Sequence, residues 1–213
     1  MNYIENIYIC LVAPLLIALL CLRGSQQRMM LFLLGGMTVC LLSSYISTFL
    51  TAVHGASILV ASLEIAPMVE ELMKLFPVLF YLLIFEPKKE CAAEGALMIA
   101  VGFATFENAC YLAANGAAQL FYLLIRGFGT GAMHVVCGLI VAMGLLNLWD
   151  RLYLRVAGTV GLLSVAATYH AIYNVLVSQT GPAAWVGYLI PVMTALLTLV
   201  FGGKQLRKIR SAM

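Results

Sequence analysis

The chain has 213 residues, of which 63% are hydrophobic and only 10% are charged, and its mean hydropathy is +1.02. A soluble domain, in which about 25% of the residues are usually charged, could not bury this much apolar surface. The composition therefore excludes a soluble globular protein. It predicts a single membrane domain over residues 1–213, built from helices that each need about 20 apolar residues to cross the bilayer.

Seven apolar runs separated by polar residues predict an all-α transmembrane bundle of about seven helices. The runs lie at 3–22, 29–53, 57–85, 91–114, 119–148, 154–178 and 183–203. The first run lacks the positively charged start of a cleaved signal peptide, so we expect it to be retained as a helix. Six cysteines are scattered along the runs without a CxxC or Cys/His spacing, which indicates small buried residues rather than a zinc or redox motif.

The basic residues between the runs are confined to one side of this arrangement. They follow the first, third, fifth and seventh runs, at Arg23, Arg28, Lys88, Lys89, Arg151, Arg155, Lys204, Arg207, Lys208 and Arg210. The alternate connections, at 54–57, 115–119 and 178–184, contain neither Lys nor Arg. Because basic loops stay in the cytoplasm, the pattern predicts a multi-pass protein of the cell membrane with an external N-terminus and a cytoplasmic C-terminus. The lipid bilayer is the expected surrounding, and a nucleic-acid partner is not expected.

Ionisable residues also occur inside the runs, where a charge at the bilayer centre costs about 2.5–3.5 kcal/mol. They are Glu64, Glu70, Glu71 and Lys74 in the third run, Glu107 in the fourth, Arg126 and His134 in the fifth, and His170 in the sixth. Counted from the cytoplasmic helix ends, Glu70, Glu107, His134 and His170 all lie at a depth of roughly 21–24 Å. This common depth predicts a shared site. Five acidic residues near the ends of the runs are expected in solvent or at the interface, namely Glu5, Glu86, Glu90, Glu94 and Asp150.

The spacing within two of the helices adds to this prediction. Lys74 lies four residues after Glu70 and three after Glu71, so its ammonium can pair with either member of this glutamate pair and leave the other free. His170 and Asn174 lie four residues apart, which puts an imidazole and an amide one turn apart on one face. Two such groups can donate hydrogen bonds to a developing oxyanion.

Each of these residues also has a purely structural interpretation. The alternatives are an ion pair for Glu71 and Lys74, helix packing for His134, interhelical hydrogen bonds for Asn108 and Asn174, and extension to the interface for Arg126. Two adjacent glutamates, a third glutamate and two histidines at one depth exceed what helix packing requires. The set as a whole therefore favours a functional site.

The order of these motifs resembles the PrsW-type intramembrane proteases, relatives of the CAAX-prenyl endopeptidase and bacteriocin-immunity (CPBP) superfamily. The matching elements, over residues 64–178, are Glu70-Glu71-x-x-Lys74, Phe103-x-x-x-Glu107-Asn108, Arg126 followed by His134, and His170-x-x-x-Asn174. The resemblance implies hydrolysis of a peptide bond in the membrane. It also implies a single-pass membrane protein, such as an anti-sigma factor, as the substrate.

The resemblance further implies roles for individual residues. Glu70 would be the general base with Glu71 in support, while His170 and Asn174 would stabilise the tetrahedral intermediate. The chain follows the PrsW pattern at Glu107, where the prenyl endopeptidases carry a histidine. The expected catalytic group is Glu70, Glu71, Lys74, Glu107, Asn108, His134, His170 and Asn174, and the expected substrate contacts are Phe103 and Arg126.

Two ways of activating water are compatible with these residues. Metal-free chemistry by glutamate and histidine is expected, because Lys74 lies within a turn of the glutamate pair and disfavours a dication. The alternative is catalytic zinc held by Glu107, His134, His170 and one member of the glutamate pair, since two histidines and a carboxylate with an open position suit that ion. Buried carboxylates and histidines would also suit a proton- or ion-coupled transporter, although no broken or inverted-repeat helices are visible. A non-enzymatic scaffold or immunity protein is the third alternative.

The predicted topology is testable with reporter fusions. A green fluorescent protein fused after Met213 should fluoresce, because it matures in the cytoplasm, while alkaline phosphatase at the same position should be inactive. The same reporters inserted in the connection 178–184 should give the opposite result. An active phosphatase at the C-terminus would contradict the predicted orientation.

Overall fold

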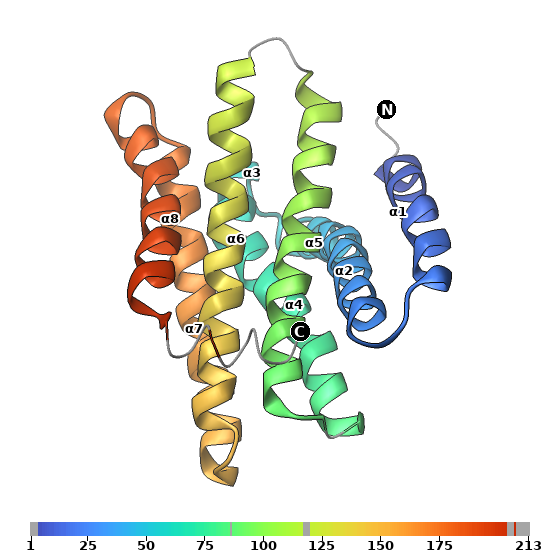
Figure 1. Ribbon diagram of the computed structural model, residues 1–213. Coiled ribbons are helices and arrows are strands. Elements are labelled where there is room, and N and C mark those ends of the chain that lie inside the picture. Colours follow the sequence, from blue (N-terminus) through green and yellow to red (C-terminus); the bar gives the residue numbers. More distant parts are fainter. Residues whose placement is uncertain (1–3, 86, 117–119, 204–206, 208–213) are drawn as a thin grey trace.

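The computed structural model describes residues 4–85, 87–116, 120–203 and 207, and within these ranges it contains only helices and their connections (Figure 1). In chain order the elements are α1 (Ile4–Cys21), α2 (Gly24–His54), α3 (Ile58–Val60), η1 (Ala61–Ile65), α4 (Ala66–Phe85), α5 (Lys89–Asn115), α6 (Leu120–Leu148), α7 (Leu152–Val177) and α8 (Pro182–Phe201). α3, η1 and α4 follow one another without a break and form one helix that contains a wide, π-type turn. The predicted all-α bundle with seven long helices is confirmed for the described residues.

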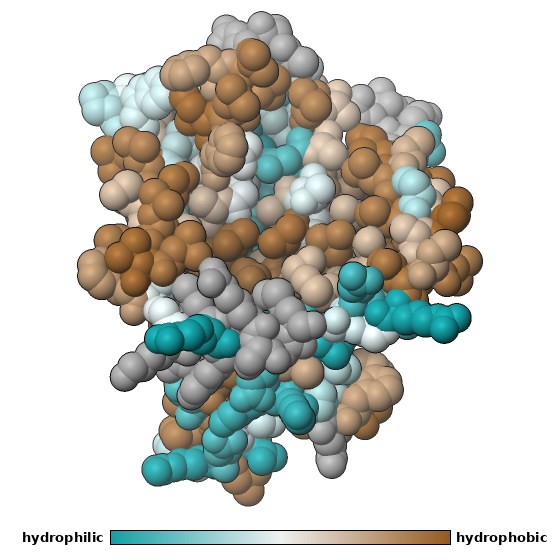
Figure 2. All heavy atoms as spheres, in the orientation of Figure 1, coloured by the Kyte–Doolittle hydropathy of each residue, from teal (hydrophilic) through white to brown (hydrophobic). Residues whose placement is uncertain are grey.

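Six of the described helices, α1, α2, α5, α6, α7 and α8, are long and apolar enough to cross a membrane. α4 differs from them because three charged residues, Glu70, Glu71 and Lys74, lie within its 20 residues. Apolar side chains cover most of the face seen in Figure 2, and hydrophilic side chains gather at its lower end. The chain is therefore a multi-pass integral membrane protein, as its composition predicted.

The basic connections lie on one side of the bundle. The α1–α2, α4–α5 and α6–α7 connections and the end of α8 all fall in the lower half of Figure 1. Lys89 Nζ donates to Asp150 Oδ2 at 2.5 Å, which joins two of these connections. Lys204, Lys208 and Arg210 lie outside the described residues. The connections that carry the basic residues thus lie on the same side of the folded bundle. The orientation of the bundle in the membrane stays a prediction.

The crossing of α2 and α5 brings two helix backbones into direct contact. A Cβ atom added to Gly36 would lie 2.2 Å from the Ile99 carbonyl oxygen, and one added to Gly102 would lie 2.0 Å from the Leu33 carbonyl oxygen. Glycine at both positions lets the two backbones touch, as small residues do between membrane helices. This crossing fixes the position of α5, which carries the Phe-x-x-x-Glu-Asn motif of the candidate site.

Glu94 corrects one expectation about the helix ends. Its side chain is 1% exposed rather than solvated, and Arg28 donates to its Oε2 at 2.9 Å across the contact between α2 and α5. α5 begins at Lys89, so Glu94 already lies more than a turn inside the helix, where it needs a cationic partner. Among the other acidic residues expected near helix ends, Glu5 accepts a hydrogen bond from Tyr45, and Glu86 lies outside the described residues.

The glycine crossing predicts that two neighbouring glycines differ in how well they tolerate replacement by alanine. Gly36→Ala should lower the free energy of unfolding by about 1–3 kcal/mol, because the added methyl group forces α2 away from α5. Gly35→Ala is the matched control, since nothing lies within 4 Å of a Cβ at that position. Thermal unfolding of the two variants in detergent measures the difference. Equal unfolding temperatures would show that the crossing tolerates extra bulk.

Candidate functional site

Six of the residues selected from the sequence form one continuous chain of polar contacts across four helices. The links, in order, are Arg126 to Glu107 at 3.4 Å, Glu107 to His134 at 2.5 Å, His134 to Lys74 at 2.9 Å, Lys74 to Glu71 at 2.6 Å, and Glu71 to His170 at 2.8 Å. We refer to these residues as the ionic chain. Its members come from α4, α5, α6 and α7, so the expected meeting of ionisable residues from these four helices is confirmed.

Lys74 is the centre of the ionic chain. Its ammonium donates to Glu71 Oε1 and approaches His134 Nδ1, and it lies 4.5 Å from the centroid of the Phe103 ring. A lysine ammonium has three N–H donors and no acceptor, so a carboxylate, an imidazole nitrogen and the face of an aromatic ring satisfy it well. These contacts offset the cost of burying the charge.

The hydrogen bonds also decide which imidazole nitrogens carry protons. Because the Lys74 ammonium donates to Nδ1 of His134, the other nitrogen, Nε2, carries the proton and donates to Glu107 Oε2. In the neutral ring of His170, Nδ1 donates to Glu71 Oε1 and Nε2 carries the lone pair. This Nε2 atom lies 3.8 Å from an oxygen of Glu70, which is longer than a direct hydrogen bond.

The two members of the glutamate pair have different surroundings. The Glu71 side chain is 3% exposed, whereas that of Glu70 is 19% exposed and that of Glu107 is 31% exposed. Both histidines are buried. The site therefore opens to its surroundings on the side of Glu70 and Glu107, while Glu71 and Lys74 form its closed interior.

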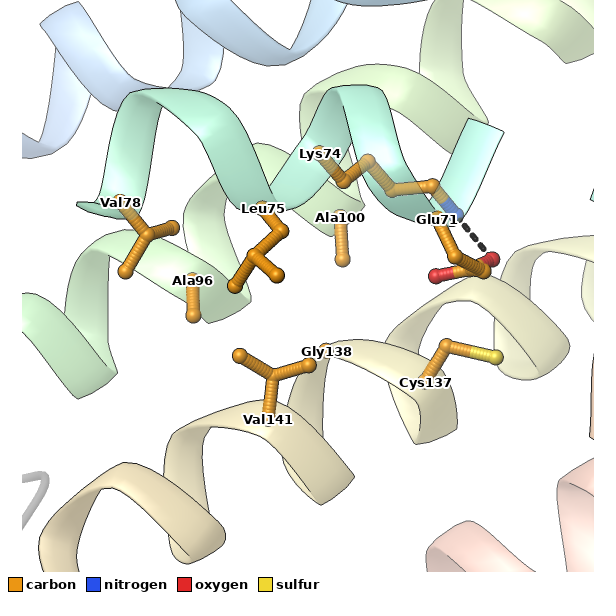
Figure 3. A pocket seen from close by; sticks show the side chains of 9 residues that line it. All are labelled: Glu71, Lys74, Leu75, Val78, Ala96, Ala100, Cys137, Gly138 and Val141. Carbon is orange, nitrogen blue, oxygen red and sulfur yellow. Dashed lines mark hydrogen bonds and ion pairs between the residues drawn. The ribbon is translucent and has the colours of Figure 1, made fainter. Parts of the chain in front are cut away.

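A small cavity lies on the closed side of the site. Its volume of about 10 Å³ is enough for one water molecule, and Glu71 and Lys74 meet at one end of it, beside Cys137 (Figure 3). The remaining walls are hydrocarbon or backbone, from Leu75, Val78, Ala96, Ala100, Gly138 and Val141. The room beside the ion pair on this side is therefore limited to a molecule the size of water, whereas Glu70 is partly exposed.

Arg126 is held against the motif residues of α5. Its guanidinium donates to Asn108 Oδ1 at 2.7 Å and to Glu107, and its central carbon lies 3.4 Å from the centroid of the Tyr111 ring. Arg126 thus pairs inside the bundle rather than extending to the interface. Tyr111 was missed by the sequence analysis, although its position four residues after Glu107 places it on the same face of α5.

Phe103 packs against two residues of the ionic chain. Its ring is 1% exposed and lies 4.9 Å, between ring centroids, from that of His134, in addition to its contact with Lys74. The sequence analysis expected a substrate contact here. In the structure the ring has almost no free surface, because it packs between the imidazole and the ammonium, so Phe103 is a packing residue of the site.

Asn174 lies one turn beyond His170 on α7, as its spacing predicted. Its side-chain nitrogen donates to the Ser62 carbonyl oxygen at 2.9 Å, which joins α7 to η1. A carboxamide has two N–H donors, so one of them remains for another acceptor. A backbone carbonyl has no side-chain signature, and Ser62 was therefore not found from the sequence.

Three donors are close enough to share a metal ion. One ligand atom each of Glu70, His134 and His170 lies within 4.8 Å of the others. Of the donors expected from the sequence, Glu70 is the member of the glutamate pair that comes close to the two histidines, whereas Glu107 bonds to His134. Two imidazoles and a carboxylate suit catalytic zinc, and Glu71 gives His170 the outer hydrogen bond typical of a metal-bound histidine. The three carboxylates of the site outnumber its two cations, which leaves an excess negative charge. The three donors therefore fit a dication in type and spacing, provided that His134 Nε2 gives up its bond to Glu107.

Comparison with known proteins identifies one family. The model of a family described as PrsW family intramembrane metalloprotease matches residues 25–200. No curated protein and no solved structure matches the chain significantly. The matched range includes every residue of the ionic chain, together with Glu70 and Asn174.

The unequal burial of the glutamate pair predicts unequal effects on stability. Glu71→Gln should lower the free energy of unfolding by about 3–5 kcal/mol, because it leaves the buried Lys74 charge without its counter-charge. Glu70→Gln, the matched control one residue away, should change it little, because Glu70 is partly exposed and lies outside the ionic chain. Thermal and denaturant unfolding in detergent would measure both. Equal losses would contradict the division between a structural and an open carboxylate.

Proposed function

The chain belongs to the PrsW family of intramembrane metalloproteases, and we propose that it hydrolyses a peptide bond of a membrane-anchored protein by means of water activated at Glu70. Membership of this family supports the general activity, which is that of an intramembrane protease. The choice of Glu70, the manner of water activation and the substrate class are the proposal, and the contacts of the site support them.

The observation that carries the proposal is the gap between Glu70 and His170. Glu70 Oε2 and His170 Nε2 are 3.8 Å apart and both present lone pairs; the Glu70 side chain is partly exposed, while that of His170 is buried. One water molecule can bridge two acceptors at this separation by donating a hydrogen bond to each. Glu71 fixes the ring of His170 through Nδ1, so the two acceptors have a constant spacing.

Glu70 then has the position of a general base. It takes a proton from the bridging water while the water oxygen forms a bond to the substrate carbonyl carbon. The same carboxyl group then gives the proton to the leaving amine as the carbon–nitrogen bond breaks, so that protons balance over one turnover. General acid–base catalysis of this kind contributes about 10²–10⁴-fold to a rate.

The carbonyl oxygen of the substrate gains negative charge in the transition state and needs hydrogen-bond donors. The free N–H of the Asn174 amide is the donor that the structure supports best, since its partner N–H is held by Ser62. The sequence analysis assigned the same role to His170. The bond from His170 Nδ1 to Glu71 favours a water-holding role for that imidazole instead.

A metal ion is the second way in which these residues could activate water, and the description of the family favours it. Glu70, His134 and His170 would hold the ion, and a zinc ion so bound would polarise its water and remove the need for a strong base. The hydrogen bonds of His134 favour the metal-free mode, because its Nδ1 faces the Lys74 ammonium and its Nε2 proton is donated to Glu107.

The expected substrate is a single-pass membrane protein, such as the anti-sigma factors implied by the family resemblance. Glu70 lies on α4, which packs among helices that are long and apolar enough to span the bilayer, so we expect a substrate chain that itself enters the membrane to reach Glu70. The bond must also leave its own helix, because helical carbonyls are already hydrogen-bonded. The open side at Glu70 and Glu107 offers polar partners for such an unwound segment.

The proposal is tested by comparing new protein termini in cells that carry wild type or Glu70→Gln. Termini within or beside single-pass segments should appear with wild type, and the purified proteins should reproduce the cleavage in liposomes. Glu70→Gln should reduce the rate at least about a hundredfold at unchanged folded protein. Glu90→Gln is the control, since Glu90 lies in the first turn of α5, away from the site. Full activity of Glu70→Gln would exclude Glu70 as the base.

Metal content separates the two modes of water activation. The glutamate mechanism predicts that activity persists after prolonged treatment with a strong chelator, and that elemental analysis finds far less than one zinc per protein. Near-stoichiometric zinc that is lost with activity, and restored with it, would replace the glutamate mechanism by the metal mechanism. Binding of zinc by Glu70→Gln, His134→Ala and His170→Ala would then test the three ligands directly.

A further inference from the structure

The wide turn η1 leaves one backbone carbonyl without a donor from its own helix. The Ala66 N–H bonds to the Ala61 carbonyl, five residues back, which is the π-type spacing. The next donor at this spacing, for the Ser62 carbonyl, would be the N–H of residue 67. Residue 67 is proline, which has no N–H. Since the Ala66 N–H is already used, neither the π nor the α spacing supplies a donor to Ser62.

Asn174 supplies the missing donor. Its side-chain nitrogen lies 2.9 Å from the Ser62 carbonyl oxygen. A second link joins the same two helices: His170, one turn before Asn174 on α7, bonds at 2.8 Å to Glu71, nine residues after Ser62. The helix that contains η1 and α4 is thus tied to α7 at two points, and these two points together fix the direction of the Asn174 amide relative to the His170 ring.

We propose that Pro67 is a positioning residue for Asn174: by withholding an N–H, it keeps the Ser62 carbonyl free to hold one amide N–H, so that the other is aimed at the substrate carbonyl oxygen. This inference rests on the proposed function. It explains why a helix that carries the glutamate pair tolerates a buried proline just before it. Interruptions of π type are frequent at functional sites, where they redirect backbone groups.

The same helix provides a matched comparison in Pro77. Pro77 also lies inside α4, ten residues after Pro67 and on the far side of the glutamate pair and Lys74. Both prolines remove an N–H from the helix. Only Pro67 lies beside a carbonyl that accepts from a residue of the candidate site, so only Pro67 is expected to affect catalysis.

Kinetics test the positioning role. Pro67→Ala restores the N–H and gives the Ser62 carbonyl a donor from its own helix, which releases Asn174. With the single-pass protein found in the terminus comparison as probe, kcat should fall on the order of a hundredfold with KM unchanged, because an oxyanion donor is misplaced. Pro77→Ala should keep the wild-type kcat. Pro67→Gly also restores the N–H and serves as a second variant if the alanine protein does not accumulate.

A double-mutant cycle distinguishes positioning from a general loss of structure. If Pro67 acts through Asn174, Asn174→Ala should lower kcat in the wild type but should cause little further loss in the Pro67→Ala background. Additive losses, or a wild-type kcat in both Pro67 variants, would overturn the proposal.

The same double-mutant cycle can be measured with unfolding temperatures, which do not require cleavage of a substrate. Asn174→Ala orphans the Ser62 carbonyl in the wild type, so it should lower the unfolding temperature more there than in Pro67→Ala, where the helix supplies a donor. Equal shifts in the two backgrounds would overturn the link between Pro67 and Asn174. If the wild type cleaves no substrate, the proposed function fails, and this cycle still decides whether Pro67 controls the Asn174 bond.

Discussion

The buried ammonium of Lys74 is the constraint on which the centre of this protein depends. A cation inside a bundle of membrane helices must be surrounded by acceptors, and here they come from three helices: Glu71 on its own helix, His134 on α6 and the Phe103 ring on α5. None of these helices can rotate without exposing the charge to hydrocarbon. The ammonium therefore fixes the relative rotation of α4, α5 and α6, and through Glu71 it extends this constraint to His170 on α7.

Adjacent glutamates acquire different properties from this arrangement. Successive residues on a helix point about 100° apart, so when Glu71 turns into the bundle to meet Lys74, Glu70 must turn towards the opening. The first is a fixed counter-ion and the second a partly exposed carboxylate beside an imidazole lone pair. Two identical side chains thus acquire different surroundings from their places on one helix, which is how the paired carboxylates of many hydrolases come to differ.

The number of helices and the meeting of their polar groups could be predicted because both depend on distances along the chain. The rise per residue places motifs at a depth once the helix ends are known. Rotation about each helix axis could not be predicted, because it depends on contacts such as the glycine crossing of α2 and α5. For this reason Glu94 was expected in solvent or at the interface and is buried, and the ring of Phe103, an expected substrate contact, is 1% exposed. Of the expected metal donors, one of the glutamate pair comes close to both histidines, whereas Glu107 bonds to His134. The Ser62 carbonyl was beyond sequence reasoning, because it is a backbone atom freed by a proline.

The cavity beside Glu71 and Lys74 affects whether protons could leak through the bundle across a membrane. Three carboxylates and two imidazoles in one layer would carry protons between the compartments if water reached them from both faces. On the inner side, room for a single water molecule is followed by the hydrocarbon of Leu75, Val78 and Val141 (Figure 3). Beyond the room for one water molecule this wall is apolar, and an apolar wall does not hold the chains of water along which protons move. The closed side of the site therefore opposes the passage of protons through the bundle.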